Sequence, residues 1–144
     1  MDVSDLRKRI IRALDEARKD SVSRREVVDA ATAAYQEFLT TTAVPLVRQA
    51  VTVLRAEGHA FTANTPANSV RLTSDHAPQT FLEFELDASG ARPQVIGRVS
   101  VTRGRQGVVV EERPIAPEKA LTDLGDDDVA KFLVTEIPKL VVRS

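Results

Sequence analysis

Residues 24–57, RREVVDAATAAYQEFLTTTAVPLVRQAVTVLRAE, form the longest helical pattern in the chain and decide the predicted fold. An α-helix turns by about 100° per residue, so apolar residues three and four positions apart share one face. Before Pro45 this face holds Val27, Val28, Ala31, Ala34, Tyr35, Phe38 and Leu39. After Pro45 another face holds Leu46, Val47, Ala50, Val51 and Leu54. On a straight helix these faces differ in direction by roughly 120°, which predicts two different packing partners.

Pro45 stands where the apolar face changes direction. Proline removes a backbone N–H donor and clashes with the preceding turn of a helix. The three residues Thr40, Thr41 and Thr42 before it are poor helix formers. We therefore predict a kink or a break in the helix between Thr40 and Leu46.

The residues before this stretch predict a first helix over 3–20. Its apolar side chains recur at steps of three and four and are Val3, Leu6, Ile10, Leu14 and Ala17. A start signal for the second helix follows, because Ser23 and Glu26 match a capping box and Val22 and Val27 match a hydrophobic staple. Since the connection is very short, the two helices are predicted to form an antiparallel hairpin.

From His59 onward the hydrophobic period changes to two, which is typical of half-buried strands. The predicted strands cover residues 59–64, 70–73, 82–87, 95–102 and 106–113. Short turns join them without an intervening helix, which predicts an antiparallel meander. On its solvent face, the register predicts Arg98 between Glu83 on one neighbouring strand and Glu111 on the other.

The end of the chain predicts a C-terminal helical segment over 117–143. Pro117 and Glu118 favour the start of a short helix, and Gly125 ends it before Asp126 caps the last helix. The predicted fold class is α+β, in a single domain over 1–144. It consists of a helical hairpin (1–57) with its second helix kinked near Pro45, a five-stranded antiparallel sheet (59–115), and the C-terminal segment. The second half of the long helix and the last helix are expected to cover one face of the sheet.

Composition limits the partners and the location. A net charge of −1 over 144 residues argues against nucleic acid or an acidic membrane surface as a partner. The chain has no cysteine, so it can form neither a disulfide framework nor a thiolate zinc site. No apolar run approaches the roughly 18 residues of a membrane span, and the first residues are acidic, unlike a signal peptide. We expect a cytoplasmic protein.

The sequence contains no strong catalytic motif. The glycine spacing excludes dinucleotide-binding and phosphate-binding loops, and His59 and His76 do not match a metal motif. Three residues are weak candidates for a polar site. His76 follows Ser74 and Asp75 in a turn, Glu112 is expected to point at the covered face of the sheet, and Glu136 falls within the apolar stripe of the last helix. Roles in a turn and at the rim of the core explain them better, so we predict no catalytic residue, cofactor or metal.

The predicted function therefore rests on surfaces. The leading expectation is a non-catalytic protein-interaction or self-associating module, in which Tyr35, Phe38 and Leu39 form the contact surface of a homodimer. The first alternative is a small-molecule binding module with a pocket between sheet and helices. The second is a small hydrolase or lyase that uses Glu112, Glu136 or His76.

Overall fold

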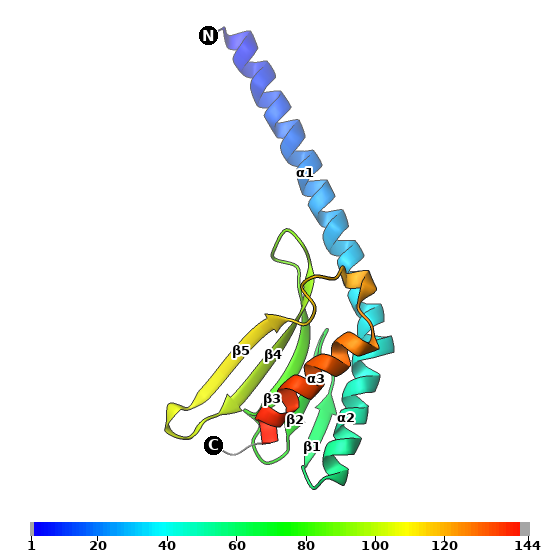
Figure 1. Cartoon of the computed structure of the whole chain (residues 1–144). Helices are drawn as coiled ribbons and strands as arrows, with labels where there is room; N and C mark the ends of the chain where they lie inside the picture. Colours follow the sequence, from blue (N-terminus) through cyan, green and yellow to red (C-terminus); the bar gives the residue numbers. More distant parts are fainter. Residues whose placement is uncertain (1, 142–144) are drawn as a thin grey trace.

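A long helical segment leads into an antiparallel sheet, which is followed by a final helix (Figure 1). The computed structural model of the chain describes residues 2–141. Its helical elements are α1 (Val3–Phe38), a π-helical turn (Leu39–Ala43), α2 (Val44–Ala56) and α3 (Asp126–Val141), with 3-10 turns at Gly104–Gln106 and Leu121–Asp123. Its strands are β1 (Phe61–Asn64), β2 (Val70–Ser74), β3 (Phe81–Asp87), β4 (Gln94–Thr102) and β5 (Val108–Pro114). Residues 142 and 143 of the predicted C-terminal segment lie outside the described residues.

The α+β class and the five-stranded antiparallel meander are confirmed, since the strands pair in the order β1-β2-β3-β4-β5. Helices α2 and α3 pack on the same face of this sheet, α2 against β1 and β2, and α3 against β3 and β4 (Figure 1). Among residues 2–141, no helix has the length and apolar character needed to cross a membrane.

The predicted helical hairpin is wrong, because α1 runs without interruption through the expected connection at residues 21–23. Ser23 is therefore an exposed residue in mid-helix and not a cap. The connection contains neither glycine nor proline, so continuing the helix there costs little. Ending one helix and nucleating another would cost more than propagation, and the capping-box match did not overcome this difference.

The predicted kink or break near Pro45 is replaced by a continuous π-helical turn over Leu39–Ala43. The N–H of Val44 donates to the carbonyl of Leu39, five residues earlier. The hydroxyls of Thr40 and Thr41 donate to the carbonyls of Gln36 and Glu37, at 3.0 and 2.7 Å. The same kind of bond, from a hydroxyl to the carbonyl four residues earlier, occurs in the regular helices at Thr32, Thr52 and Thr135. Pro45 lies in the first turn of α2, where its missing N–H is tolerated.

The π-helical turn also corrects the prediction that the two apolar faces meet different partners. Such a turn adds about one residue to the helical winding and so rotates the following residues by about 100°. This rotation nearly cancels the offset of roughly 120° between the faces on a straight helix. Tyr35 and Phe38 before the turn, and Val47 and Leu54 after it, consequently belong to one buried core.

The hydroxyl of Tyr35 fixes α1 to the sheet. It donates to the carbonyl of Asn68 at 2.7 Å and to that of Phe84 at 3.2 Å. Burial, reinforced by the negative charges of Glu85 and Glu83, raises the pKa of this phenol well above its ordinary value. Asn68 adopts a left-handed backbone conformation in the β1–β2 turn (φ 58°), and its side chain accepts from Gln36. The C-terminal part of α1 is thus held by specific polar contacts as well as by packing.

The strand register confirms one half of the predicted charge pattern. Glu83 is opposite Arg98 as expected, but the residue on the other side of Arg98 is Glu112 and not Glu111. A pairing of Arg98 with Glu111 requires a two-residue turn at Gly104, whereas the loop closes through a longer 3-10 turn, with the N–H of Arg103 donating to the carbonyl of Gly107. The longer loop shifts the pairing by one residue and exchanges the faces of β5.

Candidate functional site

The N-terminal part of α1 extends away from the sheet, as Figure 1 shows. Every residue from Asp2 to Val27 is exposed, whereas Ala31, Tyr35 and Phe38 further along the same helix are buried. We call the helical residues Val3–Val27 the arm. Large apolar side chains on the arm remain between 47% and 81% exposed and are Val3, Leu6, Ile10, Ile11, Leu14, Val22 and Val27.

Most of these apolar side chains lie on one side of the arm. We define the arm stripe as Val3, Leu6, Ile10, Leu14 and Ala17. On the count of 100° per residue, the stripe spans roughly 80° of the helix circumference. Tyr35 and Leu39, which pack against the sheet, fall within the same sector. The side of α1 that forms the core near the sheet is therefore also apolar along the arm, where it is uncovered, and Ser21 and Arg24 separate the two apolar parts.

An uncovered arm is unfavourable for an isolated chain. Most helices in proteins are stabilised by packing of their apolar face and only weakly by intrinsic propensity. On the arm, the pair between Arg18 and Asp15 is long at 3.8 Å and solvent-exposed, so it contributes little. Contiguous exposed apolar surface is uncommon in monomeric proteins and more frequent where a protein contacts another molecule.

A hollow lies at the base of the arm, where the β3–β4 loop approaches α1. It encloses about 500 Å³ and its lining consists of Arg24, Val27, Val28, Ala88, Ser89, Gly90, Ala91 and Pro93. We call it the arm-base hollow. The carboxylate of Asp87 accepts from the N–H and the hydroxyl of Ser89, which orders the start of this loop and lowers the pKa of Asp87. The hollow therefore begins at Arg24, about two helical turns beyond Ala17, the last residue of the arm stripe.

The three residues predicted as the contact surface lie elsewhere. Tyr35, Phe38 and Leu39 are only 1%, 5% and 6% exposed, and they pack against the sheet within the same chain. The apolar residues that remain open, Leu6, Ile10 and Leu14, are ones that the predicted hairpin would have covered. Their spacing correctly predicts an apolar helical face, but the second helix of the hairpin, which was expected to cover it, does not exist.

Glu112 does not point at the covered face of the sheet, which corrects its predicted orientation. It pairs with Arg98 on the opposite face, with 2.7 Å between Nε and Oε1. The same arginine contacts Glu83 and Glu85, and Glu83 also pairs with Arg71 at 2.6 Å. The side chains of Arg71, Glu83, Arg98 and Glu112 thus form a cross-strand ladder over β2 to β5. Glu112 has a structural partner there.

Glu136 lies on the covered side of the sheet, as its position in the apolar stripe of the last helix suggested. It is 3% exposed, and its Oε1 is 2.7 Å from Nη2 of Arg113 while its Oε2 is 2.9 Å from Nζ of Lys139. Burial alone would raise the pKa of Glu136, but the hydrogen bonds from Lys139 and Arg113 outweigh it, so the pKa is lowered. Glu136 is therefore an ionised, paired carboxylate and poorly suited to accept a proton.

Glu136→Gln is expected to destabilise the protein by about 1–2 kcal/mol at pH 7, since it removes two charge-assisted contacts from a buried group. The pKa of Glu136 is lower in the folded chain than its ordinary value near 4.5. Its ionised form therefore stabilises the fold above that pH, and this contribution is lost as the pH falls through the folded pKa. Urea titrations of both proteins at several pH values measure this. A difference that does not shrink below pH 4 would show that the ion pairs are not the cause.

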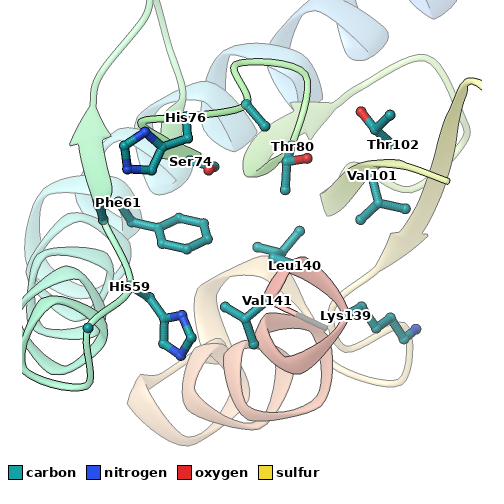
Figure 2. A pocket seen from close by; sticks show the side chains of 13 residues that line it. His59, Phe61, Ser74, His76, Thr80, Val101, Thr102, Lys139, Leu140 and Val141 are labelled. Carbon is teal, nitrogen blue, oxygen red and sulfur yellow. The ribbon is translucent and has the colours of Figure 1, made fainter. Parts of the chain in front are cut away.

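His76 lines a cavity between β1, the β2–β3 turn, β4 and the end of α3 (Figure 2). The cavity holds about 310 Å³, with Phe61, Val101 and Leu140 on its apolar side. His59, Ser74, Thr80 and Thr102 supply polar groups around them. Lys139 lies at its far side and extends away from the imidazoles, since its Nζ binds Glu136 (Figure 2). Neither Glu112 nor Glu136 lines this cavity, so the three predicted polar candidates do not form one site.

No group of three or more His, Asp or Glu residues between positions 2 and 141 is arranged to hold a metal ion. Comparison of the chain with known protein families, with curated proteins and with solved structures finds no match. The function is therefore argued from the geometry of this chain alone.

Proposed function

We propose that the chain is a non-catalytic self-associating module whose contact element is the arm stripe. The observation that carries this proposal is that one side of α1 is apolar both near the sheet and along the arm. Near the sheet this face is buried in the core, and along the arm the same face exposes Leu6, Ile10 and Leu14 to about half of their area. An apolar helical face that continues beyond its own fold is typical of a helix that packs on another helix.

The contacts of the polar side chains favour structural roles for them over catalytic roles. Glu136 is neutralised by two cations, and Glu112 belongs to the cross-strand ladder. The cavity at His76 has a volume at the lower end of those that hold small ligands. Its two histidines are exposed, however, and water can satisfy both imidazoles without a ligand. A small-molecule binding module is therefore the less supported alternative.

Leu14→Glu is expected to abolish self-association, because it places a charge in the middle of an apolar contact that excludes water. The wild-type chain is expected to show a mass above that of one chain by light scattering after size exclusion, at tens to hundreds of micromolar. Ser23→Glu is the matched control, because it adds the same charge to the opposite, exposed side of α1 and should leave the mass unchanged. The melting temperature of dilute monomer should be nearly equal in all three, since the arm lies outside the core. A wild-type mass of one chain at every concentration would refute the proposal.

A further inference from the structure

The arrangement of the associated chains can be inferred from the positions of the arm stripe, its neighbouring charges and the arm-base hollow along α1. Resting on the self-association proposed above, we propose that the partner is a second copy whose arm lies antiparallel to the first. In this two-fold arrangement the first turn of each arm reaches the arm-base hollow of the other chain.

A parallel arrangement is disfavoured by the position of the sheet. The arm stripe faces the same side of α1 as Tyr35 and Leu39, and the sheet is packed on that side further along the helix. Two parallel arms that meet through their stripes would direct both sheets into the same space between the helices. Antiparallel arms place the two sheets at opposite ends of the helix pair, where they do not collide.

The sizes of the side chains fit antiparallel packing. Before Leu14 the stripe carries the large residues Leu6 and Ile10, and after Leu14 the same side of the helix carries the small residues Ala17 and Ser21. With Leu14 beside its own copy, Ile10 lies opposite Ala17 of the partner subunit and Leu6 opposite Ser21 of the partner subunit. Large residues then fill the space beside small ones. Parallel packing would instead set Ala17 and Ser21 each against itself and leave gaps.

The charges beside the stripe also favour antiparallel packing of the two arms. Arg9 and Asp20 lie on one flank of the arm, eleven residues apart and too distant to pair within a chain. Antiparallel arms centred near Leu14 bring Arg9 next to Asp20 of the partner subunit, twice in each dimer. Asp2 on that flank likewise approaches Arg24 of the partner subunit, which lies in line with Leu6 at the edge of the stripe. Parallel arms would place Arg24 and Arg25 close to their own copies, and like charges repel.

The length of the arm brings its first turn to the arm-base hollow. Val3 lies eleven residues before Leu14, a distance of about 17 Å along the helix. The same distance beyond Leu14 in the partner ends at residue 25, between Arg24 and Val27, which line the hollow. The helix pair alone offers a strip of about 37 Å by 10 Å per chain, less than the roughly 800 Å² of a standard interface. Contact at the two hollows enlarges this area, and we expect association in the micromolar range.

Cysteine cross-linking tests the arrangement, because the chain has no cysteine of its own. With Leu6→Cys and Ser21→Cys combined in one chain, mild oxidation should give a covalent dimer in high yield, since disulfides need closely opposed Cβ atoms. Each single variant should stay monomeric on a denaturing gel. A parallel dimer would reverse this result, with the Leu6→Cys chain cross-linking to itself, and would overturn the antiparallel proposal while leaving self-association in place. A light-scattering mass of one chain would instead refute self-association.

Charge reversal provides a second measurement. Arg9→Asp alone should weaken association roughly fivefold, because two exposed ion pairs are lost per dimer. Combining Arg9→Asp with Asp20→Arg should restore it, and Arg12→Asp, on the side of the helix that faces away from the arm stripe, should leave it unchanged. Failure of the double variant to recover would show that Arg9 and Asp20 do not meet.

Discussion

Deletion of Thr41 is expected to destabilise the protein by at least about 4 kcal/mol, enough to lower its melting temperature by more than 10 °C. Thr41 lies in the π-helical turn that aligns α1 with α2. Removing one residue converts this turn to α-helical winding and rotates α2 by about 100°. Val47 and Leu54, now 0% and 7% exposed, would then leave the core, and each buried aliphatic side chain contributes about 1.5–3 kcal/mol.

The substitution Thr41→Ala separates the length of the turn from the chemistry of the residue. It keeps the residue count and removes the hydroxyl that donates to Glu37 at 2.7 Å, together with the γ-methyl group. Its expected cost is about 1 kcal/mol, because Thr41 is exposed. Thermal and urea unfolding of the three proteins give the comparison. If the deletion and the substitution are equally stable, the π-helical turn does not set the position of α2.

Gly97→Ala is expected to destabilise the protein by about 3 kcal/mol, or roughly 8 °C in melting temperature. A Cβ at this position in β4 would lie 2.2 Å from Cζ of Phe132, far inside van der Waals contact. The ring cannot move aside easily, because Phe132 is 2% exposed. The ring centroid of Phe84 lies 5.4 Å from that of Phe132, and Cζ of Arg113 lies 4.6 Å from the Phe132 centroid. Both neighbours confine the Phe132 ring.

A double-mutant cycle with Phe132→Leu identifies the cause of this loss. Phe132→Leu alone should destabilise the core, whereas in the Gly97→Ala background its added cost should be much smaller, since the smaller side chain relieves the contact. Gly90→Ala is the control, because a Cβ there has no neighbour within 4 Å. Additive effects of Gly97→Ala and Phe132→Leu would show that the methyl group and the ring do not collide.

The sheet could be predicted from the sequence because its signals are local and repeated. In β3, Leu82, Phe84 and Leu86 alternate with charged residues, and turn residues separate the strands on both sides. The pairing of Glu83 with Arg98 followed from this alternation. The next pairing failed by one residue, since nothing in the sequence distinguished a two-residue turn at Gly104 from the longer loop that forms.

The helices were harder to predict, because the start of a helix and a change in its winding both depend on residues outside the local pattern. The match of Ser23 and Glu26 to a capping box is real, but a helix start also requires the preceding chain to leave the helix. The change of apolar face at Pro45 was recognised, yet the sequence alone did not distinguish a kink from a π-helical turn. Both errors concealed the arm, since a hairpin would have covered Leu6, Ile10 and Leu14.

The two edge strands of the sheet, β1 and β5, affect how large an assembly this chain can form. A sheet with unpaired edge strands can form hydrogen bonds with strands of further molecules and so grow without limit, as in fibres. Here β1 is only four residues long, and β5 carries Glu111, Glu112 and Arg113 before ending at Pro114. Short length, charge and proline all discourage such strand addition. Growth by that route is thus suppressed, and a pair of arms related by two-fold symmetry closes on itself after two chains.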